Sequence, residues 1–349
     1  MGTQCHYCGT TLWMFTSIAS AVGTIIGNVL TLSAILMSKK LSSMMANYFV
    51  FSLAVSDLMV GITLPYHMLF YTIDGFGNIK YTCLLRFVLT SFASSSSICN
   101  LLFIAMDRYL AIVYPLHYTR FMVQKFAFTL ITIGWVVAFT TAFVPLVWNE
   151  WTEGVTCEIV NVFPQNYMQY ILLPMFSLVW TTMLLLYTRI CHEASGQHKK
   201  IMVSGNLHQS KSFQMTLVIL GCFTICWLPY FVIVIYIRTT KNDQTATLYE
   251  IFFNLAMANS CMNPLIYAWK NKTFRKAFLN LMKCRHPDRN AHFVTNHVPS
   301  KRNSVNGIWN VNCQREELTT GTEMSTHDDK IENNVIQRIT DNSTTLSQT

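Results

Sequence analysis

Charged residues are scarce in this sequence. Asp, Glu, Lys and Arg make up 12% of the 349 residues and hydrophobic residues 52%, whereas roughly 25% charge is typical of globular proteins. A soluble protein of this length needs more charge to cover its surface, so the composition excludes a soluble enzyme, a nucleic-acid-binding domain and a disordered protein. The apolar residues instead form blocks of about 20 or more, long enough for helices to cross a hydrocarbon layer. The sequence therefore predicts a protein that spans a membrane several times.

Other signals are also missing, and each absence narrows the class of membrane protein. The alternation that the strands of a membrane barrel need is not found, so the spans are expected to be helices. Internal repeats and charges along a path through several spans, typical of transporters and channels, are not found either. Apart from His67, the ten histidines lie outside the apolar blocks, so a membrane enzyme would lack its catalytic cluster. A transporter is kept as a disfavoured alternative, and no enzyme activity is predicted.

The apolar blocks predict an all-α membrane protein, a seven-transmembrane helix bundle within residues 12–270. The spans are placed at residues 12–37, 45–72, 82–113, 126–148, 167–191, 211–238 and 248–270. No basic segment precedes the stretch 12–37, which is also too long for a signal peptide, so it is predicted to be the first span. Residues 286–349 are polar, with 14 Ser or Thr residues, and are predicted to be a disordered tail.

Lys and Arg are distributed unevenly between the connections, and this predicts the orientation. One set of connections is basic and carries Lys39, Lys40, Arg120, Lys125, Arg189, Lys199, Lys200, Lys211, Lys270, Lys272, Arg275 and Lys276. The other set carries little beyond Lys80, Arg86, Arg238 and Lys241, and residues 1–11 carry none. Because basic connections stay in the cytoplasm, we expect residues 1–11 outside the cell and the carboxyl terminus in the cytoplasm.

Residues 271–285 have the pattern of a short amphipathic eighth helix at the inner surface of the lipid bilayer. Phe274, Phe278, Leu281 and Met282 repeat at helical spacing, with basic residues off that stripe. Cys284 follows them and is a candidate for palmitoylation. A plain thiol is the alternative at that position.

Ionisable residues inside the spans need an explanation, because an acid at the centre of a span costs about 2.5–3.5 kcal/mol on insertion scales. Asp57 lies in the middle of the second span, and Asp107-Arg108-Tyr109 lies at the cytoplasmic end of the third. Taken alone, Arg108 could be an anchor that reaches the membrane surface.

The polar and proline residues of the spans follow a fixed order, one set in each span. The sets are Gly27-Asn28-Val29; Leu53-Ala-Val-Ser-Asp57; Cys83, Asp107-Arg108-Tyr109 and Pro115-Leu116; Trp135; Pro174; Phe223-Thr-Ile-Cys226-Trp227-Leu-Pro229; and Asn259-Ser260 with Asn263-Pro264-Leu-Ile-Tyr267. Each set alone is a weak signal, whereas the complete order is specific. Over residues 10–285 the chain resembles a class A (rhodopsin-like) G-protein-coupled receptor, which implies a plasma-membrane protein.

Within that family, three stretches are most similar to adenosine receptors: Asn47-Tyr-Phe-Val-Phe-Ser-Leu-Ala, Pro164-Gln-Asn-Tyr-Met168 and Tyr187-Thr-Arg-Ile. The residues that read the ligand differ from that group. Ile159-Val160 replace a Phe-Glu pair, Val234 replaces an Asn, and Ala256-Met257 replace a Ser-His pair. The chain therefore resembles the adenosine-receptor group, but the resemblance does not imply that adenosine is its ligand.

The resemblance implies two sets of residues in the middle of the bundle. A sodium ion, which as a hard cation prefers oxygen ligands, would be bound at rest by Asp57, Ser97, Asn259, Ser260 and Asn263. A water-filled hydrogen-bond network without an ion is the alternative, and no other cofactor is expected. The residues implied to rearrange on activation are Ile98, Pro174, Phe223, Trp227, Pro229, Pro264 and Tyr267.

At the cytoplasmic end, the resemblance implies coupling to a heterotrimeric G protein through Asp107-Arg108-Tyr109 and Leu116. Asp107 would hold Arg108 at rest and release it to the carboxyl-terminal helix of the G protein. Leu116 would fill a hydrophobic pocket of the G protein.

Two residues depart from the family pattern and leave basal activity open. Gln209 stands where many relatives have an acid that locks the arginine. Thr182 stands where the fifth span usually has an inward Tyr, eight residues after its proline. An orphan or decoy receptor with weak or no coupling is therefore the alternative function.

On the extracellular side, Cys83 and Cys157 resemble the disulfide that ties the second loop to the third span, in an oxidising compartment. Cys5 and Cys8 lie on the same side, and their spacing leaves a second bridge open. Lys301-Arg302-Asn-Ser304 fits the pattern of a kinase site in the tail. Receptor kinases and arrestin are therefore expected partners, since phosphate adds negative charge for a basic arrestin surface.

The ligand pocket is expected to be aromatic and hydroxyl-bearing, and to be lined by His67, Phe87, Thr90, Ser91, Ser94, Tyr230, Phe231, Val234, Phe253 and Met257. Monoamine receptors carry an acid where this chain has Thr90, so a cationic amine is disfavoured. These side chains suit an extracellular small molecule that is neutral or amphipathic. Arg86 and Glu250 near the mouth could recruit a charge on the ligand, although a solvated rim is the favoured interpretation.

Overall fold

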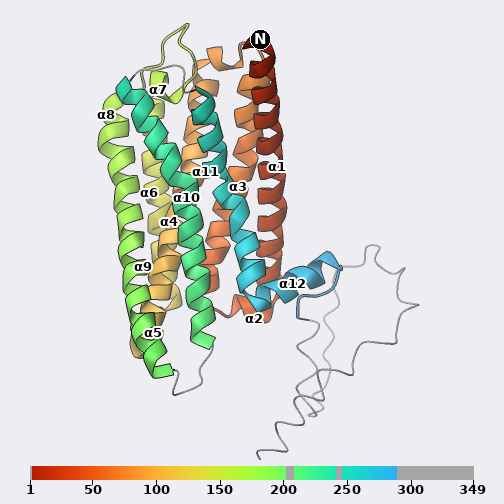
Figure 1. Ribbon diagram of the computed structural model, residues 1–349, viewed down its shortest axis with the longest axis vertical. Coiled ribbons are helices and arrows are strands. Elements are labelled where there is room, and N and C mark those ends of the chain that lie inside the picture. Colours follow the sequence, from red (N-terminus) through yellow and green to blue (C-terminus); the bar gives the residue numbers. More distant parts are fainter. Residues whose placement is uncertain (1, 202–207, 241–245, 289–349) are drawn as a thin grey trace, which may run out of the picture. The chain divides into compact units, whose positions relative to one another are not determined.

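The computed structural model describes residues 2–201, 208–240 and 246–288, with side chains described over 13–193, 217–240 and 247–288. The described residues are helical apart from short connections, and no strand occurs among them. The long helices are α1 (Gly2–Met37), α3 (Ala46–Thr72), α4 (Lys80–Val113), α6 (Gln124–Val147), α9 (Leu173–Ile201), α10 (His208–Thr240) and α11 (Ala246–Lys270). They lie side by side as a bundle (Figure 1). The predicted seven-helix architecture is confirmed.

Short elements join the long helices and complete the fifth span. They are α2 (Lys39–Ser42), a 3-10 turn (Phe76–Asn78), α5 (Pro115–Phe121), α7 (Ile159–Val162) and α8 (Gln165–Tyr167), which continues through a π-helical turn (Met168–Leu172) into α9. The helix α12 (Lys272–Met282) follows the bundle.

Six helices of the described part are long and apolar enough to cross a membrane, covering Trp13–Met37, Ala46–Thr72, Lys80–Val113, Gln124–Val147, Gln165–Glu193 and Leu217–Thr240. The helix α11 is more polar because it contains Asn254, Asn259 and Asn263. It packs against α1 and α10, so it is the seventh member of the bundle.

Two helices extend beyond the spans predicted for them, although the apolar stretches Trp13–Met37 and Gln165–Glu193 agree with those spans. The helix α1 begins at Gly2 and not at residue 12, so the segment predicted to precede the bundle is helical from its second residue. The helix α9 continues to Ile201, ten residues beyond the predicted end of the fifth span. Both extensions are polar, and hydropathy marks only the apolar part of a helix.

The helix α12 has the predicted amphipathic pattern. Asn271 caps its first turn, because the side-chain oxygen accepts hydrogen bonds from the backbone N–H groups of Thr273 and Phe274 at 2.9 and 3.3 Å. Phe274 and Phe278 are buried, whereas Met282 is exposed. Cys284 is also exposed, and its lipidation stays a prediction.

The close approach of α1 and α11 depends on a small residue in the first span. A Cβ atom added at Gly27 would lie 2.8 Å from Cγ and 3.0 Å from Cβ of Pro264, closer than carbon atoms pack. Small residues at such crossings let helix backbones approach one another in a membrane. The space beside Gly221 in α10 is open, with nothing within 4 Å of an added Cβ.

We expect Gly27→Ala to destabilise the receptor bundle by about 1–3 kcal/mol, because the new methyl group overpacks the α1–α11 contact. Gly221→Ala is the matched control and should be neutral or stabilising, by up to about 1 kcal/mol, since alanine is the better helix former. Thermal unfolding of both variants in detergent measures the difference. An unchanged midpoint for Gly27→Ala would contradict the close packing of these helices.

Candidate functional site

A buried carboxylate joins three helices in the middle of the bundle. Asp57 on α3 is fully buried. One of its oxygens accepts a hydrogen bond from the Ser97 hydroxyl on α4 at 2.7 Å, and the other accepts from the Asn263 amide on α11 at 2.8 Å. Ser260 and Asn259 are buried on the same helix as Asn263. The structure thus brings the predicted polar core together.

The donor chemistry of this core fits a hard cation. Asp57 supplies a carboxylate, and the hydroxyl of Ser97 contacts it; Ser260 interacts with the same carboxylate. Carboxylate and hydroxyl oxygens are the ligands that such cations prefer. The core residues would therefore hold a sodium ion, and the ion itself stays a prediction.

The cytoplasmic end carries the predicted ion pair. Arg108 lies 2.7 Å from the buried carboxylate of Asp107, and the Tyr118 hydroxyl of α5 donates to the other oxygen of that carboxylate at 2.8 Å. Burial and the neighbouring carboxylate raise the pKa of Tyr118, so its phenol stays protonated and keeps donating. Asp107 is therefore held by both Arg108 and Tyr118. The contact with Tyr118, which lies between the third and fourth spans, was not evident from the sequence. Leu116 on α5 is 90% exposed.

The inward tyrosine of the fifth span is Tyr187, and the prediction that Thr182 had replaced it is wrong. Tyr187 is 2% exposed and interacts electrostatically with Arg108. The Thr182 hydroxyl instead bonds to the carbonyl of Leu178 in its own helix. Counting eight residues from Pro174 failed because this chain places its proline elsewhere in the span. Tyr187 begins the stretch Tyr187-Thr-Arg-Ile, one of the three that resemble adenosine receptors.

Pro174 corrects the predicted activation residues in the same way. Its side chain is exposed, so it does not pack with Ile98 and Phe223. The buried residue of α9 at this depth is Phe176, whose ring lies 6.1 Å from that of Phe223 and stacks on Phe231 at 3.6 Å. The π-helical turn before α9 shifts the face on which later residues lie, and this turn has no simple sequence signal.

The other predicted switch residues lie in the core. Phe223, Trp227 and Tyr267 are buried, and Pro229 and Pro264 lie inside α10 and α11. Among the described residues, the indole N–H of Trp227 and the hydroxyls of Tyr187 and Tyr267 have no hydrogen-bond partner. Burying a polar group without a hydrogen-bond partner costs free energy. A rearrangement that supplies a partner would therefore stabilise each of these groups.

The opposite end of the bundle is closed by a disulfide. Cys83 at the start of α4 is bonded to Cys157, with their Cα atoms 5.8 Å apart. The predicted bridge is present, and it holds the segment between α6 and α8 over the bundle. The side chains of Cys5 and Cys8 lie outside the described residues, as does that of Gln209; Ser304 lies outside them altogether.

Eight of the ten predicted pocket residues line one narrow cavity of about 90 Å³ above Trp227: Thr90, Ser91, Ser94, Tyr230, Phe231, Val234, Phe253 and Met257. None of the described residues that line it is acidic. We call it the lower cavity. Ile159 of α7 forms part of its wall and also lines a second cavity.

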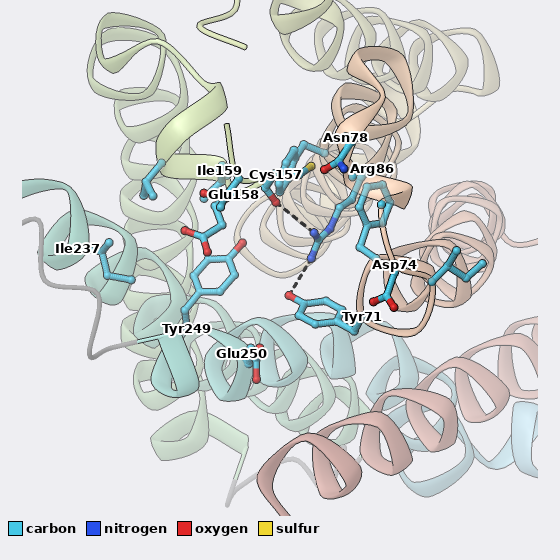
Figure 2. Close-up of a pocket in the computed structure, with 17 residues that line it drawn as sticks. Tyr71, Asp74, Asn78, Arg86, Cys157, Glu158, Ile159, Ile237, Tyr249 and Glu250 are labelled. Carbon is cyan, nitrogen blue, oxygen red and sulfur yellow. Dashed lines mark hydrogen bonds between the residues drawn. The ribbon is translucent and has the colours of Figure 1, made fainter. Parts of the chain in front are cut away.

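The second cavity, here the upper cavity, has a volume of about 430 Å³ and lies beside the disulfide (Figure 2). Phe87 lines this cavity and not the lower one. His67 lines neither, because it is buried against Arg86 and stacks on Phe253 with ring centroids 4.3 Å apart. Both residues were expected in the ligand pocket with the other eight, whereas Phe87 lines the upper cavity and His67 lines neither cavity.

Arg86 contradicts the expected solvated rim, because it is only 5% exposed. Its guanidinium carbon lies 4.6, 5.0 and 5.3 Å from the ring centroids of Phe70, Tyr71 and Phe87. Glu250 is half-buried on the far side of the upper cavity. The sequence does not reveal the burial of Arg86, because this burial comes from rings on two helices.

Comparison with known proteins agrees with this geometry. The sequence model of the family "7 transmembrane receptor (rhodopsin family)" matches residues 27–267. The chain belongs to this family. The receptor is 32% identical to the histamine H2 receptor of Canis lupus familiaris over 77% of this chain and 78% of the relative.

Two further relatives have similar sequence identity to this chain. The adenosine receptor A2a of Homo sapiens is 30% identical, over 79% of this chain and 73% of the relative. The D(1A) dopamine receptor of Xenopus laevis is 28% identical, over 84% and 77%. The predicted class of receptor is confirmed, and an enzyme is excluded by the family.

We expect Tyr187→Phe to leave the resting receptor as stable as the wild type or stabilise it by about 1 kcal/mol, because it removes a buried hydroxyl without a partner. Thr182→Val, which deletes a hydroxyl bonded only to its own helix, is the control and should change little. Thermal unfolding of the purified variants tests this. A clear loss of stability for Tyr187→Phe would show that its hydroxyl has a partner at rest.

Proposed function

We propose that this chain is a G-protein-coupled receptor that binds an extracellular small amphipathic ligand and activates a heterotrimeric G protein. One observation carries the proposal: two cavities that share Ile159 in their walls lie at one end of the bundle, the lower one lined by Trp227, and an arginine paired with Asp107 lies at the other. The orientation rests on the basic connections, which place the disulfide end outside the cell and Arg108 in the cytoplasm of a plasma-membrane protein.

The lower cavity disfavours the ligands after which the relatives are named. Histamine and dopamine are cationic amines, and a buried cation needs an opposite charge. Thr90 offers none, and its hydroxyl already bonds to the carbonyl of Arg86 at 2.8 Å. Ile159, Val234 and Met257 line the cavity with apolar surface, so the polar groups of adenosine would lose hydrogen bonds at about 1–3 kcal/mol each.

The cytoplasmic end supports coupling. Arg108 is held by Asp107, so its release would expose a guanidinium to an approaching helix of the G protein. Leu116 projects from α5 into solvent, and an exposed leucine of this kind fits a hydrophobic pocket on a partner. Tyr118 would influence how firmly Asp107 holds Arg108 at rest, because its hydroxyl donates a hydrogen bond to the same carboxylate.

Coupling is tested by nucleotide exchange on a panel of purified heterotrimeric G proteins added to membranes that contain the receptor. We expect exchange above the level of empty membranes, and Leu116→Asp to reduce it at least about tenfold by burying a charge in the contact. Thr119→Asp, exposed on the same helix, is the control. The absence of exchange with every G protein, with and without ligands from a nucleoside, lipid and amine panel, would favour the decoy alternative.

The sodium ion is proposed as a regulator of the resting state. The ion would bind only the folded receptor, so sodium should raise its thermal midpoint in the way any ligand of the native state does. Potassium chloride at equal concentration serves as the control for ionic strength.

We expect Asp57→Asn to abolish the sodium-specific rise, because the carboxamide keeps the shape and removes the charge that attracts the ion. Thermal unfolding in matched sodium and potassium solutions measures it. Identical midpoints in the two salts for the wild type would instead support the water-filled network.

Further partners are proposed on the cytoplasmic side. Receptor kinases would phosphorylate the tail, for which Ser304 is the sequence candidate, and arrestin would bind the phosphorylated chain. The exposed Cys284, which follows the amphipathic α12, is the proposed site of palmitoylation.

A further inference from the structure

We propose that the ligand of this receptor carries an oxyanion, most simply a carboxylate, and that Arg86 in the upper cavity binds it. The inference deepens the proposed function by naming the charge of the ligand. It starts from a buried cation that has no ion-pair partner among the residues whose side chains the structure describes.

Arg86 is almost completely buried, yet no carboxylate lies within ion-pair distance of it among the described residues. Its neighbours are neutral: the Tyr71 hydroxyl at 2.8 Å, the Cys157 carbonyl at 3.3 Å, and the His67 ring. The three aromatic rings around it attract the cation but are weaker partners than an anion. A buried charge is normally paired, so the missing partner is expected to come from outside.

The donor count of Arg86 supports the same conclusion. A guanidinium has five N–H donors. Nε of Arg86 lies 3.0 Å from His67 Nδ1, and a terminal nitrogen lies 2.8 Å from His67 Nε2. A neutral imidazole accepts at only one of its two nitrogens. His67, Tyr71 and Cys157 therefore accept hydrogen bonds from at most three of the five N–H groups. The other two N–H groups remain available to a ligand.

The cavity places those donors where a small molecule can reach them. Arg86 lines the upper cavity, and Figure 2 shows its guanidinium directed at Tyr71 and the backbone of Cys157. Because Tyr71 accepts from Arg86, its own O–H is free to donate to the same anion. The ring of Trp13, 4.4 Å from that of Tyr71, holds this phenol in place.

The acids near the cavity do not supply the missing charge. Asp74 and Glu158 line it but are exposed, where water screens their charge, and the half-buried Glu250 lines its far side. No ion pair between Arg86 and any of these three acids occurs among the described residues. The apolar body of the ligand would continue past Phe87 and Ile159, since Ile159 is shared by the upper and lower cavities.

The test uses the purified full-length receptor in lipid nanodiscs and matched sets of probes: octanoate, octanamide and octylamine, and 3-phenylpropanoate with its amide and amine. Thermal unfolding is followed with each probe at the same millimolar concentration. We expect the carboxylate of a set to raise the midpoint, and its amide and amine to bind at least about tenfold more weakly. Because no G protein is present, a failure here is distinguishable from a failure of coupling.

Arg86→Gln should abolish the preference for the carboxylate, and Arg86→Lys, which keeps the charge but loses the planar fork, should retain part of it. The second variant keeps the test valid if the first does not fold. Tyr71→Phe should weaken carboxylate binding about threefold to tenfold through the loss of one hydrogen bond. Lys80→Gln is the control, since it removes a positive charge at the same end from a residue that lines neither cavity.

Three results would overturn the proposal. The first is no stabilisation by any carboxylate, and the second is equal stabilisation by the amides. The third is a carboxylate effect that survives Arg86→Gln. Equal stabilisation by sodium sulfate at the probe concentration would mean that Arg86 binds an inorganic anion only, which also rejects an acidic organic ligand.

Discussion

The hydrogen bonds of Asp57 hold the centre of the bundle. Neither lipid nor the apolar side chains around it can solvate a carboxylate, so its charge depends on the Ser97 hydroxyl and the Asn263 amide. These partners come from α4 and α11, and any motion of either helix changes the environment of the acid. Pro264, next to Asn263, is also the residue against which Gly27 packs. A shift at this point would therefore reach α1, α3, α4 and α11 together.

The part of the fold that depends on hydropathy and local motifs could be predicted from the sequence. The spans follow from apolar length, and the amphipathic α12 follows from the spacing of Phe274 and Phe278. Eight of the ten residues expected in the pocket line one cavity: within each of α4, α10 and α11 they lie at helical spacing, and the family resemblance indicated that these three helices face one another there. The pairing of Cys83 with Cys157 came with the family resemblance and not from spacing.

What the sequence could not provide depends on register and on contacts between elements. A π-helical turn before α9 moves Pro174 to the surface and brings Phe176 inward, and no residue type announces such a turn. Because the proline of this span lies elsewhere than the family pattern expects, counting from Pro174 gave Thr182 the place near Arg108 that Tyr187 takes. Arg86 reads as a surface charge in sequence, and only the rings of Phe70, Tyr71 and Phe87 bury it.

Cys157 has two bonds at the mouth of the receptor: its sulfur is linked to Cys83, and its carbonyl accepts from Arg86. The backbone oxygen that helps to aim the guanidinium is thus held in place by the disulfide. Without the disulfide, the Cys157 carbonyl would no longer be held beside the Arg86 guanidinium, and the segment that contains Cys157 would no longer be tied to α4. If Arg86 binds the ligand as proposed, formation of the disulfide would also complete the ligand site, and its reduction would weaken ligand binding before it unfolded the helices.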